Sequence, residues 1–335
     1  MDGRKERILQ AVVSDYTETV VPVGSHVLAA RYFMELSSAT IRNELSELVD
    51  DGFLAQPHPS AGRVPTDLGY RYFVDFLLPQ EIVEPVLRRQ VRQRFLEVEP
   101  DVEAILELAA ATLSRLSDNV ALVTGPAEGS SRLAMAQLVS TRPGHALVVV
   151  VGSGRRAQQR TVEVDPALDQ EAINSLTEVL NRTGAGMSAE ELEACPMPEA
   201  VPRAVVLEVA AGLRQLENRS ALVLHDGVRN LVRNPEFEDP NRLRVVLEVL
   251  EAQRILAAVV SQLAPQSGVQ VVIGHENSLE ELQDCSLVLT GYRVGTQLWG
   301  TVGVVGPTRI RYARVAARLQ LISQVTGEAL ARVLA

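Results

Sequence analysis

The sequence predicts an α+β protein of at least two domains, on three observations. Its 335 residues are enough for about two domains at roughly 150 residues each. Apolar residues at helical spacing dominate up to residue 118, and short apolar runs between Gly- and Pro-containing turns then indicate strands mixed with further helices. Eight of the 13 aromatic residues lie within residues 1–80, which predicts a compact N-terminal domain with its own core.

Composition narrows the class of protein. Hydrophobic residues make up 46% and charged residues 22%, as in an ordinary globular chain. The apolar run Ala146–Val151 is far shorter than the roughly 20 residues of a membrane helix, and the start MDGRKERILQ has no apolar signal segment. Cys195 and Cys285 stand alone, which argues against a disulfide framework or a Cys-x-x-Cys metal clip. We therefore expect a cytoplasmic protein with no membrane contact, metal or other cofactor.

The N-terminal domain is predicted to contain three helices, a hairpin and a fourth helix. The first helix covers about residues 4–16, and the second covers about residues 26–31 with Ser25 as its expected N-cap. The third begins at the cap residue Ser37 and ends at Gly52, which suits the left-handed position after a helix. The inward-facing residues of the first helix are expected to be Ile8, Leu9, Val12 and Val13.

The third helix has the pattern of a DNA recognition helix. At about 100° per residue, Ile41, Leu45 and Leu48 share one inward face. The outward face of its N-terminal half is small and polar, with Arg42 on its flank; it comprises Ala39, Thr40, Asn43 and Ser46. A recognition helix presents such side chains to base edges, and its first N–H groups can meet phosphate.

The segment FLAQPHPSAGRVPT (residues 53–66) predicts a β-hairpin wing, because two extended pieces flank a tip rich in Pro, Gly and Ser. The N-terminal domain is therefore interpreted as a winged helix-turn-helix. The expected DNA-binding residues are Ser38, Thr40, Arg42, Asn43, His58, Ser60 and Arg63. A winged helix used for protein contacts is the alternative interpretation.

Charge does not identify the partner. The formal net charge is −10, and residues 1–80 hold seven Lys and Arg against eleven Asp and Glu. This balance argues against a protein that coats nucleic acid, but a few well-placed cations suffice for phosphate contacts. The following helix adds Arg88, Arg89, Arg92 and Arg94. A solvated helix face is the favoured interpretation of these arginines, and phosphate contact is the alternative.

The rest of the chain alternates between helices and strands. Residues 81–118 are predicted to be helical. The expected strands are Val120–Val123, Met135–Ser140, Ala146–Val151, Arg160–Val164, Val269–Ile273, Ser286–Tyr292 and Gln297–Val305. Further helices are expected at 167–182, 199–218 and 241–263, and after Pro307.

Motifs of enzymes and cofactor sites are weak here. Residues 152–157 match the loose pattern GxGxxA, but a strand pattern follows where a dinucleotide site needs a helix, so a hairpin turn is favoured. The five histidines are scattered without an i, i+4 pair, which does not favour a zinc site. No nucleophile–base constellation is visible, so we expect no enzymatic activity and no catalytic residues.

Two distant blocks carry a family resemblance. The first contains PVGS (22–25), SSATIRNEL (37–45) and QPHPSAGRVPTDLGYRYFVD (56–75). The second contains IGHEN (273–277), Cys285-Ser286 and GTVGVVGPTRIRY (300–312), and Asn230-Leu231 with Pro235-Glu236-Phe237 also agrees. Over nearly its whole length the chain resembles the HrcA family of bacterial heat-inducible transcription repressors. It departs at Pro59, where the family usually has Thr, and at Val49-Asp50, where Leu-Glu is common; Pro59 can change the shape of the wing tip.

The resemblance implies a domain plan and a function. It implies a winged helix-turn-helix at 1–78, a GAF-like α+β domain formed by 79–129 and 219–335, and an inserted α+β dimerisation domain at 130–218. The implied function is negative regulation of heat-shock (chaperone) operons, through binding of a homodimer to an inverted-repeat operator in double-stranded DNA. The GroE chaperonin is the implied partner that maintains this activity.

Another function class stays open. The alternative is a ligand-responsive winged-helix regulator with a small-molecule sensor in the GAF-like domain. A polar pocket between strands 269–305 and helix 241–263 would favour it.

Overall fold

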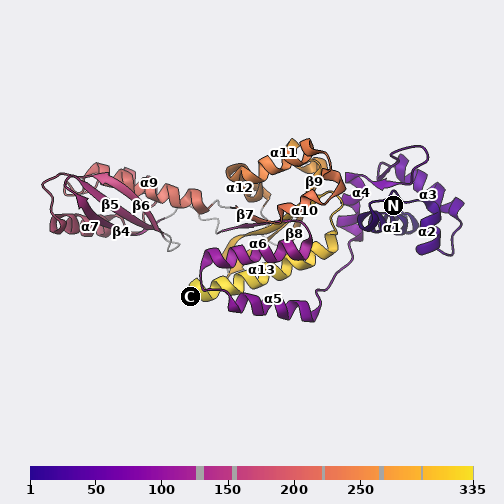
Figure 1. The fold of residues 1–335 in the computed structure, drawn as a ribbon, viewed down its shortest axis with the longest axis horizontal. Coiled ribbons are helices and arrows are strands. Elements are labelled where there is room, and N and C mark those ends of the chain that lie inside the picture. The colour runs from indigo at the N-terminus through magenta and orange to yellow at the C-terminus, as the bar shows by residue number, and fades with distance from the viewer. Residues whose placement is uncertain (126–131, 153–156, 221–222, 264–267, 296, 335) are drawn as a thin grey trace. The chain divides into compact units, whose positions relative to one another are not determined.

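The computed structural model describes residues 1–335 except 126–131, 153–156, 221–222, 264–267, 296 and 335. The expected domain boundary at 129–130 and most of the turn at 152–157 therefore lie outside the described residues. The chain divides into two compact units, one formed by Met1–Gly125 with Val223–Ala335 and the other by Pro126–Leu222. Helices and strands occur in both, which confirms the α+β class (Figure 1).

The N-terminal elements have the predicted winged-helix order. They are α1 (Gly3–Thr19), α2 (Ser25–Arg31), α3 (Ser38–Asp50), β1 (Leu54–Ala55), β2 (Val64–Pro65) and α4 (Asp67–Tyr72), which continues as a π-helical turn, Phe73–Leu77. The predicted apolar faces of α1 and α3 are buried together with Leu28 of α2. Gly52 has φ +81°, as its position after α3 requires.

The prediction for Ser25 was wrong. Gly24 is the N-cap of α2, and Ser25 is the first helical residue. The Ser25 hydroxyl is buried and lies 2.9 Å from the hydroxyl of Ser38 in α3. Because this hydrogen bond joins the two helices of the helix-turn-helix, Ser25 fixes the position of α3 instead of capping the start of α2.

A five-stranded antiparallel sheet forms the centre of the same unit. Its strands are β3 (Val120–Thr124), β7 (Val223–Asp226), β8 (Val269–Ile273), β9 (Cys285–Val294) and β10 (Gln297–Pro307), in the order β7-β3-β10-β9-β8. Counted along the domain, this is the order 2-1-5-4-3 of a GAF-like sheet. Both faces are buried, since Ala121 and Val123 of β3 enter one apolar core while Val120 and Leu122 enter another.

Helices cover both faces of this sheet. On one side lie α5 (Pro85–Glu97), α6 (Val102–Ser117) and α13 (Tyr312–Leu334); on the other lie α10 (Val228–Val232), α11 (Pro240–Glu251) and α12 (Gln253–Leu263), as Figure 1 shows. Short 3-10 turns complete the domain at Pro235–Phe237, Gly274–Glu276 and Glu280–Leu282.

The single helix predicted over 241–263 is two helices, α11 and α12. Ala252 leaves helical geometry with ψ 72°. At about 100° per residue, Val259 of an unbroken helix would lie about 140° away from Val246. The break lets both Val246 and Val259 enter the same apolar core against the sheet. The sequence has no Gly or Pro at this point to signal it.

The second unit is a three-stranded antiparallel sheet covered by helices. Its strands are β4 (Leu133–Arg142), β5 (His145–Gly152) and β6 (Ala157–Glu163), and its helices are α7 (Gln170–Gly184), α8 (Ala189–Ala194) and α9 (Arg203–Ser220). Helix α8 was not predicted, although Ser188 and Glu191 form the reciprocal capping box that marks its start. The expected inserted domain, 130–218, falls within this unit.

Two tyrosines, Tyr70 of α4 and Tyr312 of α13, provide a test of the packing between the winged helix and the GAF-like domain. Their ring centroids are 5.9 Å apart. The buried hydroxyl of Tyr70 has no hydrogen-bond partner among the described residues, whereas that of Tyr312 lies 2.9 Å from the Ser286 hydroxyl and donates to the carbonyl of Thr308.

We expect the substitution Tyr70→Phe to raise the free energy of unfolding by about 1 kcal/mol, because it removes an unpaired buried hydroxyl. The matched substitution Tyr312→Phe should lower it by about 1–3 kcal/mol, because it leaves polar partners unpaired. Urea denaturation of both variants measures the difference. If both substitutions lowered the free energy of unfolding equally, the Tyr70 hydroxyl would have a hydrogen-bond partner in solution.

Candidate nucleic-acid interface

Helix α3 starts with a well-formed cap. The Ser37 side chain accepts a hydrogen bond of 3.0 Å from the backbone N–H of Thr40. The hydroxyl of Thr40 in turn lies 2.9 Å from that of Ser37, and the hydroxyl of Ser38 is shared with Ser25. The structure therefore uses the Ser38 and Thr40 hydroxyls to shape the start of the helix.

The face of α3 turned to solvent carries Ala39, Arg42 and Asn43, which are all exposed. Among the described residues, the Asn43 amide has no hydrogen-bond partner, so both its donor and its acceptor are available. Ile41, Leu45 and Leu48 are at most 3% exposed on the opposite face, as predicted. The helix thus presents an amide and a guanidinium side by side from a firmly packed support.

Acidic residues of α3 are paired with cations from the start of α1. Arg4 lies 3.3 Å from Glu44, and Lys5 lies 2.6 Å from Glu47 and 3.8 Å from Asp51. The hydrogen bond to Glu47 raises the pKa of Lys5, which keeps the amine charged. Although residues 1–80 are net acidic, part of the negative charge beside the exposed face is balanced locally.

The wing is held by contacts at its base and across its tip. At the base, Leu54 pairs with Pro65 and Ala55 pairs with Val64. Across the tip, Gln56 donates hydrogen bonds to the carbonyls of Pro59 (2.8 Å) and Ala61 (3.1 Å). Sequence reasoning missed Gln56, because nothing in a single polar residue indicates that it spans a turn.

Gly62 permits the wing to approach the segment before α2. A Cβ atom at Gly62 would lie 2.4 Å from the carbonyl oxygen of Pro22, closer than real contacts allow. Beside it, Val23 and Arg63 exchange backbone hydrogen bonds of 2.8 and 2.9 Å. The two sequence segments PVGS and SAGR are therefore in direct backbone contact, and this contact fixes the wing beside the helix-turn-helix.

The predicted wing residues differ in how far their side chains are exposed to solvent. His58 and Ser60 are exposed at the tip. Arg63 is half-buried, and its Nη1 donates back to the carbonyl of Ala61 at 3.3 Å. On α5, Arg88, Arg89 and Arg94 are exposed, and Arg92 lies 3.2 Å from Glu328.

Other kinds of site receive little support from the geometry. The layer between the five-stranded sheet and α10–α12, where a sensor pocket was considered, is filled by a buried apolar cluster that includes Leu231, Phe237 and Leu256. Burial raises the pKa of the Cys285 thiol to about 12, which keeps this group protonated. Within the described ranges there is no cluster of three metal-ligating side chains, and no helix is long and apolar enough to cross a membrane.

Comparison with known proteins identifies the family. The family model described as the HrcA protein C terminal domain matches residues 103–316. Proteins named heat-inducible transcription repressor HrcA from Desulforamulus reducens and Roseiflexus castenholzii are 32% and 33% identical to this chain; the alignments cover 100% and 99% of it and 98% and 95% of the relatives. The chain belongs to the HrcA family.

Membership of the HrcA family indicates the general class of function, which is regulation of transcription. The relatives are named heat-inducible transcription repressors. A crystal structure described only as that of a hypothetical protein supports the fold, with a TM-score of 0.61 at 21% identity over 99% of this chain and 98% of the other. The HrcA family model covers the five-stranded sheet of the GAF-like domain and the second unit, and the full-length relatives extend the match to α5, α13 and the winged helix.

We expect Gly62→Ala to displace the wing, because the added Cβ meets the backbone of Pro22. DNA affinity should fall by about tenfold or more while the helices stay folded, since small backbone shifts remove several phosphate contacts at once. The control is Gly3→Ala, where a Cβ meets nothing within 4 Å. Fluorescence anisotropy with duplex DNA measures both variants, and equal affinities would contradict a tight wing base.

Proposed function

We propose that the chain is a negative regulator of chaperone operons that binds an inverted-repeat operator as a homodimer. The observation that carries this proposal is the exposed face of α3, where Arg42 and Asn43 lie on a helix supported by a buried apolar face and placed beside a wing. Helices of this kind enter the major groove, with side chains of the N-terminal half at the base edges.

The two exposed side chains suit different tasks. An asparagine amide can pair with both N6 and N7 of an adenine, which distinguishes one base pair from the others. Arg42 on the flank can contact a guanine or a phosphate. His58 and Ser60 at the wing tip, with Arg63 released from Ala61, are proposed to contact the backbone or the minor groove. Ser38 and Thr40 are proposed to contribute mainly through the shape of the helix start and its N–H groups.

The proposed dimer is supported by a sheet face in the second unit that none of this unit's described helices covers. On β5, Ala146, Val148 and Val150 are buried under the helices, while the alternating residues face the other way. That other face carries an apolar stripe of half-buried Leu147, Val149 and Val151, with Met135 (48% exposed) and Val139 (43% exposed) on β4. Exposed polar residues lie beside the stripe, namely Gln137 on β4 and Gln159 and Thr161 on β6. A contiguous apolar surface of this kind is typical of an interface, and a second copy of the same sheet is the occupant that two-fold symmetry favours.

We also propose, from the family resemblance, that the GroE chaperonin maintains the activity and that the protein works in the cytoplasm. The apolar strands Ala146–Val151 and Val269–Ile273 would become exposed on partial unfolding, which suits a chaperonin substrate. The net charge of −10 adds self-repulsion to the folded state.

The first test concerns base recognition. The substitution Asn43→Ala should reduce discrimination between operator and random DNA by about 1–3 kcal/mol, because it removes a base contact. Arg63→Ala should weaken both kinds of binding and lower the salt dependence by about one phosphate contact. Binding titrations at several salt concentrations separate the two effects. An equal loss of specific and non-specific binding in Asn43→Ala would remove this residue from base recognition.

The second test concerns the dimer. A lysine at Val149 would place a charge in the centre of the proposed sheet interface, so the variant Val149→Lys should be monomeric and should bind a full inverted repeat about as weakly as a single half-site. The control Glu178→Lys adds a lysine to an exposed position of α7 in the same unit. Sedimentation of the full-length proteins gives the oligomeric state, and a dimeric Val149→Lys variant would place the interface elsewhere.

A further inference from the structure

The segment IGHEN (residues 273–277) lies against α4, the helix that directly follows the wing. The Asp67 carboxylate accepts a 2.9 Å hydrogen bond from the backbone N–H of His275, and its Oδ2 lies 2.7 Å from the ring Nδ1 of the same residue. Gly274 has φ +50°, and a Cβ there would lie 2.2 Å from the Asp67 carboxylate. Only a glycine therefore allows this close approach.

One turn further along α4, Arg71 makes a bidentate ion pair with the same segment. Its Nε lies 2.8 Å from Oε1 of Glu276, its Nη2 lies 2.5 Å from Oε2, and Nη2 also donates to the carbonyl of Val271 at 2.7 Å. Paired contacts of this type fix direction as well as distance. Asp67 and Arg71 are four residues apart, so together they hold one face of α4.

In the covalent connection between the two domains, Val83 is buried in the apolar core and Glu81 lies 3.7 Å from Arg314 of α13. Residues 78–84, between the π-helical turn and α5, form no helix or strand. The apolar contact of Tyr70 with Tyr312 lies next to the polar contacts of Asp67 and Arg71. Side chains of α4 and their partners therefore contribute to the orientation of the winged helix relative to the GAF-like domain, together with the apolar core that the two domains share.

We propose that Asp67 and Arg71, with His275 and Glu276, are positioning residues that determine which half-site spacing the dimer accepts. The proposal rests on the proposed function, in which the dimer binds an inverted repeat. Two recognition helices carried by a dimer fit two half-sites only at one separation and rotation. The contacts of α4 set the direction of α3 in each subunit, because α4 follows the wing without an intervening loop.

The experiment uses full-length protein and DNA selected from a random duplex pool by the wild-type protein. Each protein is titrated with the selected inverted repeat, with repeats whose half-sites are moved apart by one to about ten base pairs, and with a single half-site. Wild type should lose about tenfold or more in affinity when a spacing change of about five base pairs turns one half-site to the opposite side of the helix. Failure of wild type to select any repeat would overturn the proposed function itself.

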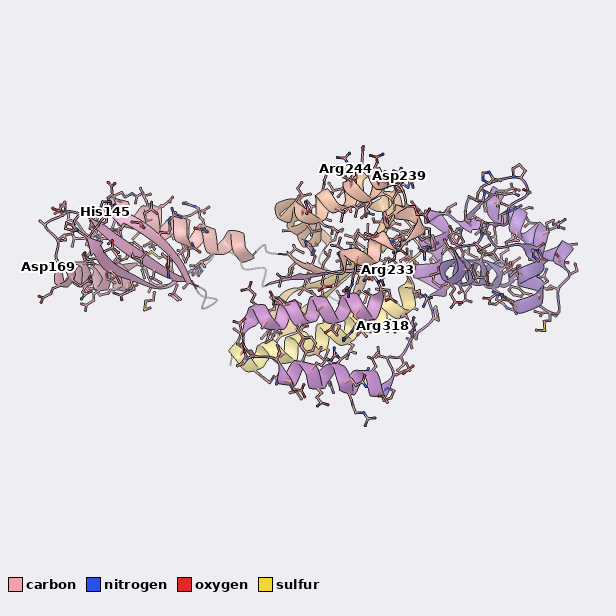
Figure 2. The ribbon with its side chains drawn as sticks, viewed as in Figure 1. His145, Asp169, Arg233, Asp239, Arg244 and Arg318 are labelled. Carbon is pink, nitrogen blue, oxygen red and sulfur yellow. The ribbon has the colours of Figure 1, made fainter. Side chains whose placement is uncertain are left out.

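The variants are Arg71→Ala, Glu276→Ala and the two combined, with Arg244→Ala as the control. Arg244, labelled on α11 in Figure 2, makes an exposed ion pair of 2.7 Å with Glu248. We expect the variants at Arg71 and Glu276 to bind the single half-site within about twofold of wild type but to lose most of the dependence on spacing. The double variant should be no worse than either single one, because the two side chains act through each other.

Two results would overturn the proposal. One is an unchanged dependence on spacing in Glu276→Ala, a variant that leaves the winged-helix sequence intact. The other is a loss of affinity for the single half-site in Glu276→Ala that is as large as the loss for the inverted repeat. That result would assign this residue a role in the folding of the DNA-binding domain instead of its orientation. The Arg244→Ala control should keep the spacing dependence of wild type.

Discussion

Burial of the five-stranded sheet on both faces is the constraint on which the rest of the larger unit depends. Its central strands β3, β9 and β10 carry apolar side chains on alternate sides, and each side needs a layer of helices. One layer comes from segments before β3 and after β10, and the other comes from the segment between β7 and β8. The sheet thus unites distant parts of the chain, since Val120 of β3 is paired with Val305 of β10.

The same sheet explains how a second unit can interrupt the domain. β3 and β7 are antiparallel neighbours, and Thr124 is paired with Val223 at the end of their ladder. The chain leaves the sheet and returns to it at adjacent positions, so residues 126–222 replace a short connection without disturbing the hydrogen-bond pattern. A separate apolar core in that unit agrees with this arrangement.

The proposed DNA-binding surface also depends on contacts that are local in space but distant in sequence. Ser25 supports Ser38, Gly62 lies against Pro22, and Lys5 offsets the charge of Glu47. Each contact places a recognition element without touching DNA in the proposed function. These contacts explain the motif PVGS and the glycine of SAGR, and the contacts of His275 and Glu276 with α4 explain IGHEN.

Local sequence patterns were enough to predict the winged-helix order, the buried face of α3, the Ser37 cap and the left-handed Gly52, because helix period, capping and backbone freedom act within a few residues. They also indicated the family, because each family motif is an unbroken run of residues. The folded chain was needed to show that Ser25 pairs with Ser38, that the helix over 241–263 breaks at Ala252, that Arg63 turns back to Ala61 and that α4 is held by Glu276. These features result from packing between segments far apart in the chain, and no local pattern records which distant atoms will meet.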